Sequence, residues 1–270
     1  MAQDTPPTSQ VARATRAETL LDYFALQLHF AEVVAAVALL PLPDAVMQCT
    51  NFYRRFGFGN PQDTPLPSEW HHYTHTLTTL ETHAQRLAWT QECFVRAPEE
   101  SLPPGRRQFG CFGCDLPDAD GRVRIHFTNQ DTDGIGPLSR AKIPARRQDL
   151  QALFTFVQRT YPEARSVLGG SWLYNLEAYR RLFPSVYGDS RTVQEGTTHF
   201  QGSSSWGQFL DHHEGVKPAL REQFLANLTR MNMRRLWEAF PLLTYRTQAP
   251  IQEFFDFLQI DHGAHSMSQT

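Results

Sequence analysis

Residues 145–174 read ARRQDLQALFTFVQRTYPEARSVLGGSWLY, and this stretch decides the fold. Its first half places apolar side chains at the i, i+3, i+4, i+7 spacing of a helix that packs by one face: Leu150, Leu153, Phe154 and Val157. After Tyr161-Pro162 the second half, residues 166–174, is an apolar run with two adjacent glycines, which predicts a buried strand with a bend. A helix that leads directly into a strand is typical of an α/β protein.

The chain upstream of this stretch predicts a β-hairpin. Residues 108–114 and 122–128 are two short β-type runs that enclose the turn-rich segment LPDADG. The second run, RVRIHF, alternates polar with apolar residues, so one face of that strand should be wet: Arg122, Arg124 and His126. Residues 129–144 then form a long polar loop.

The chain downstream supplies the remaining elements of a sheet domain. We predict a short helix over 177–182, a strand over 193–200, a helix that begins at Pro218, an edge strand over 242–246 and a last helix from Ile251 to Leu258. This order predicts an α/β (α+β) fold, in which a helical N-terminal part precedes a mixed sheet flanked by helices.

The first hundred residues carry mostly helical patterns. Apolar residues recur at helical spacing over 17–40 and 69–95, a shorter helix is expected over 43–53, and the Gly/Pro-rich residues 56–67 predict a loop. The polar start MAQDTPPTSQ has no apolar periodicity. We therefore predict a disordered N-terminus over 1–16, a helical region over 17–100 and an α/β domain over 101–270.

Composition and the polar start of the chain indicate a cytoplasmic protein. A hydrophobic content of 41% can form a large core, and a net charge of −3 gives no attraction for the phosphates of nucleic acids. The longest apolar run, over 33–42, is far shorter than the ~20 residues of a membrane span. The start lacks the apolar core of a signal peptide, so we expect the four cysteines to be reduced thiols. We expect no nucleic acid and no membrane as partners, and no oligomeric state is indicated.

Two groups of metal-binding residue types lack the remainder of a metal site. Cys111 and Cys114 form a CxxC without a second ligand pair at zinc-site spacing, and we interpret them as small buried residues. A histidine-rich run could place two imidazoles one helical turn apart, with exposed histidines as the alternative: His71, His72, His75 and His83. We expect no metal.

Common catalytic loops are also incomplete in this sequence. Gly169-Gly170-Ser171-Trp172-Leu173 lacks the second glycine of the G-x-S-x-G nucleophile elbow, which argues against a Ser/His/Asp hydrolase. No phosphate-binding loop of the Walker type and no GxGxxG after a strand occurs.

Residues 169–207 concentrate the side chains that are typical of a ligand site. Polar-tipped aromatic residues crowd this segment together with an asparagine, a glutamate and several serines: Trp172, Tyr174, Asn175, Tyr179, Tyr187, Glu195, His199 and Trp206. Such a density is more typical of a lined pocket than of bulk core, although the same rings can fill a junction of strand and helix. We expect the segment to line an open hollow.

At these residues the sequence resembles an acyltransferase-like domain of uncharacterised bacterial proteins related to the GNAT superfamily. The resemblance covers about residues 125–228 and is carried by four short runs: Tyr161-Pro162, Ser171-Trp172-Leu173, Leu182 to Pro184, and Phe200. It implies a GNAT-like sheet and acyl-CoA as the cofactor. Gly170 stands where that pattern has a histidine, and the pyrophosphate loop [RQ]-x-x-G-x-[GA] is matched only in part, by residues 107–112.

The resemblance implies an N-acyltransferase that acts on a small-molecule or protein amine. Such an enzyme needs a base for the amine and an acid for the departing thiolate. The candidates for the base are Glu195 and His199, and those for the acid are Tyr174 and Tyr187. The expected substrate-binding side chains are Ser171, Trp172, Asn175, Arg180, Arg181 and Trp206.

Two alternative functions are compatible with the same residues. One is a non-catalytic binding or adaptor protein on a degenerate GNAT-like scaffold, which the incomplete pyrophosphate loop favours. The other is a metal-dependent enzyme that uses the histidines between residues 71 and 83.

Overall fold

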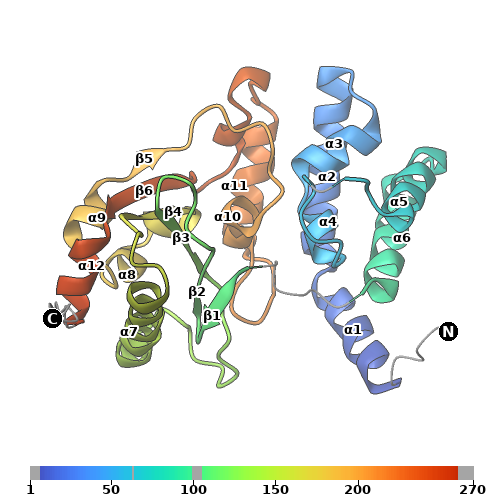
Figure 1. Cartoon of the computed structure of the whole chain (residues 1–270). Helices are drawn as coiled ribbons and strands as arrows, with labels where there is room; N and C mark the ends of the chain where they lie inside the picture. The colour runs from blue at the N-terminus through green and yellow to red at the C-terminus, as the bar shows by residue number, and fades with distance from the viewer. Residues whose placement is uncertain (1–6, 63, 99–104, 261–270) are drawn as a thin grey trace, which may run out of the picture. The chain divides into compact units, whose positions relative to one another are not determined.

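The computed structural model of the chain describes residues 7–62, 64–98 and 105–260, which divide into two compact units (Figure 1). Unit 1 comprises residues up to 103 together with 194–244, and unit 2 comprises residues 104–193 together with those from 245 onward. The α/β fold with a helical N-terminal part is confirmed. The boundary differs from the expected one, because residues 194–244 group with the N-terminal helices and not with the sheet.

Unit 1 is built from helices. Its elements are α1 (Pro7–Thr19), α2 (Leu21–Ala38), α3 (Leu42–Cys49), α4 (Phe52–Arg55), α5 (Ser68–Thr79), α6 (His83–Arg96), α10 (Ser203–Trp206), η3 (Gly207–Phe209), α11 (Pro218–Leu228) and η4 (Met233–Ala239). Because α1 begins at Pro7, residues 7–16 are helical where disorder was expected, and residues 1–6 lie outside the described part. The helix predicted over 69–95 is two helices, since Thr82 and Gln85 form a capping box that starts α6.

Aromatic rings explain why residues 194–244 belong to unit 1. Phe30 on α2 has four aromatic neighbours at ring-centroid distances of 5.4–5.9 Å, and all four come from that later segment: Phe200, Trp206, Phe224 and Phe240. Helix α2 is long and apolar enough to cross a membrane by length and composition alone. Its buried residues form this core, as expected of a core helix in a globular protein.

Unit 2 is a six-stranded mixed sheet with helices. Its elements are β1 (Arg107–Phe109), β2 (Phe112–Cys114), β3 (Arg122–Phe127), η1 (Arg140–Lys142), α7 (Ile143–Thr160), β4 (Ser166–Ser171), η2 (Trp172–Asn175), α8 (Glu177–Arg180), α9 (Ser185–Asp189), β5 (Thr192–Val193), β6 (Tyr245–Pro250) and α12 (Ile251–Leu258). The strand order is β1-β2-β3-β4-β6-β5. Only β3 and β4 run parallel, and every other neighbouring pair is antiparallel.

Two strand predictions differ from the structure. The strand expected over 193–200 is the two-residue β5, and the remainder of that range belongs to unit 1. The edge strand expected over 242–246 is β6, which starts at Tyr245 and lies inside the sheet between β4 and β5. The predicted hairpin is present with an extra turn, because β1 and β2 form a tight hairpin of their own before β3.

One face of the sheet packs against α7 and α12 (Figure 1). The four core positions predicted on α7 are buried, and Phe154 stacks on Phe254 of α12 at a centroid distance of 4.6 Å. The strands contribute alternate residues to this core, including Val123, Ile125 and Val167. Their intervening residues therefore face the opposite side of the sheet.

Gly169 on β4 has no room for a side chain. A Cβ at this position would overlap the hydroxyl oxygens of Tyr174 and Tyr187 and lie 2.6 Å from Thr247 Oγ1. The two tyrosine hydroxyls are 2.7 Å apart and fully buried. The neighbouring Gly170 differs, because the nearest atom to its missing Cβ is Arg124 Nη1 at 3.7 Å, an ordinary contact.

These contacts predict opposite outcomes for two adjacent substitutions. Gly169→Ala should lower the free energy of unfolding by about 1–3 kcal/mol, because a buried group must move to admit the methyl. Gly170→Ala should stay within about 0.5 kcal/mol of the parent chain. Urea unfolding followed by circular dichroism measures both values. Equal stability of the two variants would contradict the close approach of the tyrosine hydroxyls.

Candidate functional site

Four of the aromatic residues expected to line a hollow fill the interiors of the two units. Tyr174, Tyr179 and Tyr187 pack in the core of unit 2 with exposed fractions of 2% or less, and Trp206 is fully buried in unit 1. Trp206 Nε1 donates to the Cys49 carbonyl at 3.0 Å. The expectation of an open hollow along this segment is therefore wrong, because the polar tips of these rings find partners inside each core.

The two tyrosines expected to act as acids, Tyr174 and Tyr187, lie in the core on the covered face of β4. Burial raises the pKa of Tyr174, and it raises the pKa of Tyr187 further. Both hydroxyls are directed at each other and at Gly169. A buried phenol with a raised pKa is poorly placed to protonate a leaving group outside the core.

The other predicted substrate-binding residues of unit 2 hold the backbone after β4. Ser171 Oγ accepts from the Leu173 amide at 3.1 Å, and the Asn175 side chain donates to the Trp172 carbonyl at 2.6 Å. Arg180 Nη1 donates to the carbonyl oxygens of Tyr174 and Asn175, and Arg181 Nη2 donates to the Leu138 carbonyl. These side chains fix the chain around residues 138 and 171–175.

The residues expected to act as the base belong to the other unit. Glu195 and His199 are both exposed, and they precede α10 in the part of the chain assigned to unit 1. His199 Nδ1 lies 3.0 Å from Thr198 Oγ1. The predicted site residues are thus divided between the two units.

The cysteine and histidine groups serve other contacts. All four cysteines are free thiols, and Cys111 and Cys114 are buried. His83 pairs with Glu32 at 2.8 Å, whereas His71, His72 and His75 are exposed. Across residues 7–62, 64–98 and 105–260, no three histidine, cysteine or carboxylate side chains are grouped as metal ligands.

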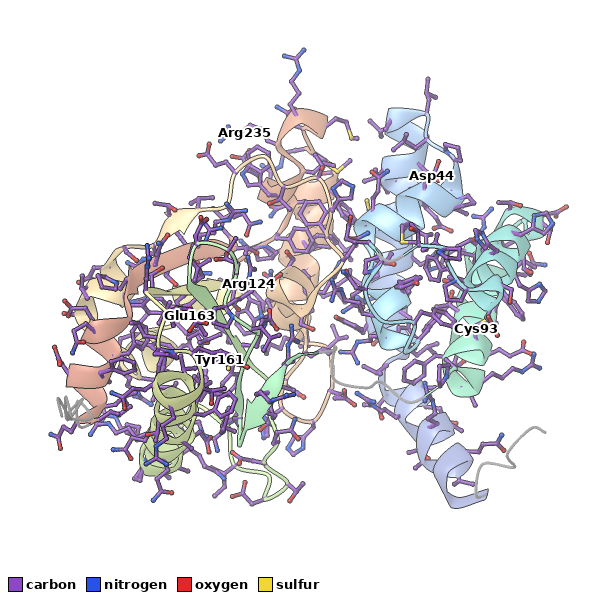
Figure 2. The ribbon with its side chains drawn as sticks, in the orientation of Figure 1. Asp44, Cys93, Arg124, Tyr161, Glu163 and Arg235 are labelled. Carbon is purple, nitrogen blue, oxygen red and sulfur yellow. The ribbon has the colours of Figure 1, made fainter. Side chains whose placement is uncertain are left out.

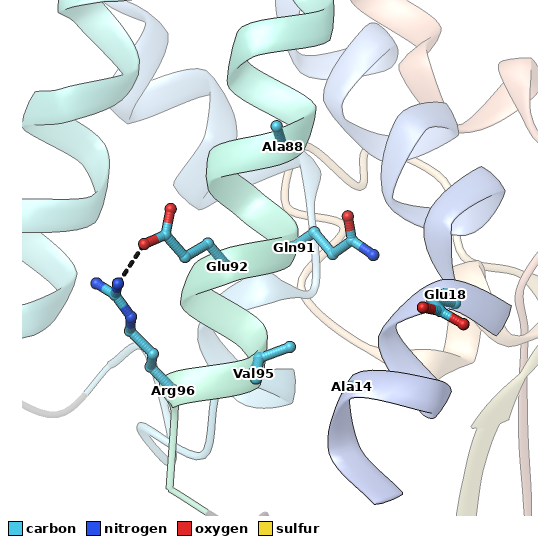
Figure 3. A pocket seen from close by; sticks show the side chains of 7 residues that line it. All are labelled: Ala14, Glu18, Ala88, Gln91, Glu92, Val95 and Arg96. Carbon is cyan, nitrogen blue, oxygen red and sulfur yellow. Dashed lines mark ion pairs between the residues drawn. The ribbon is translucent and has the colours of Figure 1, made fainter. Parts of the chain in front are cut away.

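A shallow hollow of about 300 Å³ lies between α1 and α6 of unit 1 (Figure 3). It is lined by Ala14, Glu18, Ala88, Gln91, Glu92, Val95 and Arg96. Glu92 and Arg96 form an ion pair across one turn of α6. None of the predicted site residues lines this hollow.

The two parallel strands of unit 2, β3 and β4, pair only over their first three residues and then separate. β3 and β4 pair through Arg122–Ser166, Val123–Val167 and Arg124–Leu168, and no ladder pair follows. Both strands continue for three more residues, over 125–127 and 169–171, where each pairs only with its outer neighbour. Backbone groups that face the gap therefore lack strand partners, and parallel strands bring both carboxyl ends to this edge, where ligands of α/β sheets bind.

The face of the sheet opposite α7 and α12 carries a group of charged residues around Gly170. Strand parity places Arg124 and His126 of β3 on this face, and Gly170 shares it with its ladder partner Arg246 of β6. Arg124, labelled on β3 in Figure 2, and Arg246 are exposed. We name this group, with Arg106 and Asp115, the open-face cluster.

His126 and Asp115 form a hydrogen-bonded dyad in this cluster. His126 Nε2 lies 2.7 Å from Asp115 Oδ2, and Arg106 Nε donates to Asp115 Oδ1 at 2.9 Å. Burial opposes ionisation of Asp115, but the contacts with His126 and Arg106 outweigh it and lower its pKa to about 2. An ionised Asp115 accepts the Nε2 proton, which leaves the lone pair of His126 on Nδ1.

The charge state of His126 follows from its surroundings. Burial lowers the pKa of His126, and the guanidinium groups of Arg106 and Arg124 act in the same direction against the attraction of Asp115. The ring is therefore neutral at pH 7, and no residue in the described structure makes a hydrogen bond to Nδ1. A neutral histidine held by a carboxylate is the arrangement of a general base.

The loop between β3 and α7 leaves from the same carboxyl edge. Gly134 has a left-handed φ of 72°, and no atom lies within 4 Å of the position of a Cβ on Gly134 or Gly136. No other side chain therefore crowds these two positions of the loop.

Carboxylates of the loop hold most of the cations at the start of α7. Asp131 contacts Lys142 Nζ at 3.2 Å and Arg146 Nη2 at 3.0 Å. Arg146 Nε also lies 3.3 Å from Asp149. Arg140 is exposed and forms no ion pair with any residue that the structure describes.

Sequence reasoning missed the open-face cluster although part of its signal was present. The alternation in RVRIHF correctly places Arg124 and His126 on one face. Asp115 lies 11 residues before His126 and just beyond a strand, so only the β2–β3 register brings the two together. Arg246 belongs to the open-face cluster because β4 pairs with β6, and the paired residues lie about 75 positions apart in the sequence.

The dyad predicts shifts of the His126 pKa with opposite signs. Arg124→Gln should raise this pKa, because it removes a repelling positive charge, and Asp115→Asn should lower it, because it removes an attracting negative charge. NMR titration of the His126 ring in the full chain measures both shifts, with the resonance assigned by its loss in His126→Gln. Shifts of the same sign would contradict this electrostatic arrangement.

Comparison with known proteins finds no matching family model, no matching curated protein and no matching solved structure.

Proposed function

We propose that unit 2 is an acyltransferase that transfers an acyl group from a coenzyme A thioester to an amine. The observation that carries this proposal is the parting of β3 and β4 beside the His126–Asp115 dyad. An extended thioester arm requires unpaired backbone groups along its length, and amine acylation requires a base at the point of transfer. Both lie at one edge of this sheet, and the GNAT-like resemblance points to the same chemistry.

The residues present fit a coenzyme A thioester at two places. The arm fits the gap between residues 125–127 and 169–171, where backbone groups have no ladder partners. The phosphates fit the surface at the start of α7, where Arg140 is exposed and forms no ion pair with any residue that the structure describes. Lys142 already forms ion pairs with Asp131 and Asp133, so we assign the phosphates to Arg140 and not to Lys142.

Coenzyme A supplies the acyl group in an activated form, as a thioester. His126 Nδ1 accepts the proton that the amine nitrogen loses as the C–N bond forms, and it returns this proton to the sulfur as the C–S bond breaks. Asp115 and Arg106 hold the imidazole in the required tautomer through the contacts at Nε2 and Oδ1. Unpaired backbone N–H groups of the parted strands stabilise the negative charge on the carbonyl oxygen during the transfer.

This proposal replaces the residues first considered for catalysis. His126 takes the role considered for Glu195 and His199, and it also serves as the acid in place of Tyr174 and Tyr187. We further propose a small-molecule amine as the acceptor and a cytoplasmic location, which the four free thiols support. Nucleic acid and membrane are not among the proposed partners.

The proposed base predicts the effect of His126→Gln on transfer. The glutamine retains a polar side chain but cannot take a proton, so kcat should fall by about 100- to 10,000-fold. Loss of thioester absorbance with acetyl-CoA and longer acyl-CoAs measures the rate, and calorimetry should show unchanged binding of the same donors. His213→Gln, an exposed histidine of unit 1, is the matched control and should keep the parental rate.

The lowered pKa of His126 predicts the pH dependence of the reaction. His126 must be neutral to act as a base, so kcat should be lost as pH falls through a pKa below the usual 6.5 and should be level above it. Asp115→Asn should alter this profile, whereas His213→Gln should not. If none of the acyl-CoAs binds the folded chain, the proposed function is excluded, and the binding-protein alternative is favoured if they bind without turnover.

A further inference from the structure

We infer that the acceptor is a small amine that also carries an anionic group, which Arg124 and Arg246 bind. This inference rests on the proposed function, since it names the substrate class of the same site. The shared chemistry is an oxyanion, either a carboxylate or a phosphate.

The arginines on the open face of the sheet differ in whether a carboxylate balances their charge. Arg122 on this face pairs with Asp118 at 2.8 Å and with Asp120 at 3.0 Å, and Arg106 pairs with Asp115. Arg124 and Arg246 differ, because neither forms an ion pair or a side-chain hydrogen bond with any residue that the structure describes. The open-face cluster therefore has two guanidinium groups without a counter-charge.

Arg124 and Arg246 lie on either side of Gly170. Arg246 is the ladder partner of Gly170 on β6, and Arg124 Nη1 lies 3.7 Å from the position of the missing Cβ. Gly170 itself presents only backbone, so no side chain of its own fills the surface between the two arginines. The fork of a guanidinium matches the two oxygens of a carboxylate or phosphate, and two such groups can share one anion.

The proposed base lies on the same strand as one of these arginines. Arg124 and His126 stand two residues apart on one face of β3, a spacing of about 6.5 Å along a strand. An anion bound at Arg124 thus places an amine a few bonds away within reach of His126 Nδ1. Small amino acids and amino-phosphates have this separation between nitrogen and anionic group.

Asp115, the carboxylate of the open-face cluster, does not neutralise Arg124 or Arg246. Asp115 is engaged through both oxygens, with His126 at one and Arg106 at the other. The two guanidinium groups also repel a bound cation, so simple alkylamines without an anionic group should bind poorly.

The test uses matched pairs of amines and reads binding separately from catalysis. The probes are glycine against glycinamide for a carboxylate, and O-phosphoethanolamine against ethanolamine for a phosphate. NMR titration of the full chain follows the Gly170 amide and the His126 ring. The anionic member of at least one pair should bind about 10- to 100-fold more tightly than its neutral partner, as expected for charge-assisted hydrogen bonds.

The variants assign this preference to the two arginines. The double variant Arg124→Gln, Arg246→Gln should lose the preference, whereas Arg122→Gln, which alters a paired arginine of the same face, should retain it. The pair that shows the preference identifies carboxylate or phosphate. Equal binding of all four probes, or a preference that survives the double variant, would overturn the inference.

The outcomes for donor and acceptor remain distinguishable. Anion-selective binding at Gly170 without any binding of acyl-CoA supports the anion site formed by Arg124 and Arg246 and excludes the acyl transfer. Acyl transfer that proceeds equally well to glycinamide and ethanolamine supports the transferase and overturns the inference.

Discussion

The two adjacent glycines of β4 are the constraint on which unit 2 depends. On the covered face, Gly169 lets the hydroxyls of Tyr174 and Tyr187 approach the strand, so these rings can pack in the core against β4 and β6. On the opposite face, Gly170 leaves bare backbone between Arg124 and Arg246. A side chain at position 169 would overlap the two hydroxyls, whereas position 170 has room for a methyl group, so the two glycines act differently on the two faces of the same strand.

Elements whose burial is set by their own periodicity could be predicted from the sequence. The predicted core positions of α7 are all buried, because a one-sided apolar stripe indicates both the helix and the face that packs. The place of β6 inside the sheet could not be predicted in this way. It follows from pairing with Ser166–Ser171 far upstream, and no local pattern in YRTQAP distinguishes an inner strand from an edge.

The functional residues were harder to predict because the same side chains serve cores and sites. Tyr174, Tyr187 and Trp206 have polar tips that a binding site could use, but each tip is satisfied inside a core. The side chains of the open-face cluster come from four separate segments of the chain. Only the alternation through Arg124 and His126 gave an indication at short range, and the partner Asp115 required the register of β2 and β3.

The path of the chain between β5 and β6 has a consequence for how the protein is made. Val193 pairs with Tyr245, and the Gln194 amide bonds to the Thr244 carbonyl, so residues 194–244 leave and return at one point as an insertion within a hairpin. This insertion carries Phe200, Trp206, Phe224 and Phe240, the rings that surround Phe30. During synthesis on the ribosome the N-terminal helices emerge first, yet their core stays incomplete until most of the sheet unit has been translated. The N-terminal helices therefore complete their core only after residues 194–244 have emerged, and the apolar helix α2 is the segment that a chaperone would have to shield in the interval.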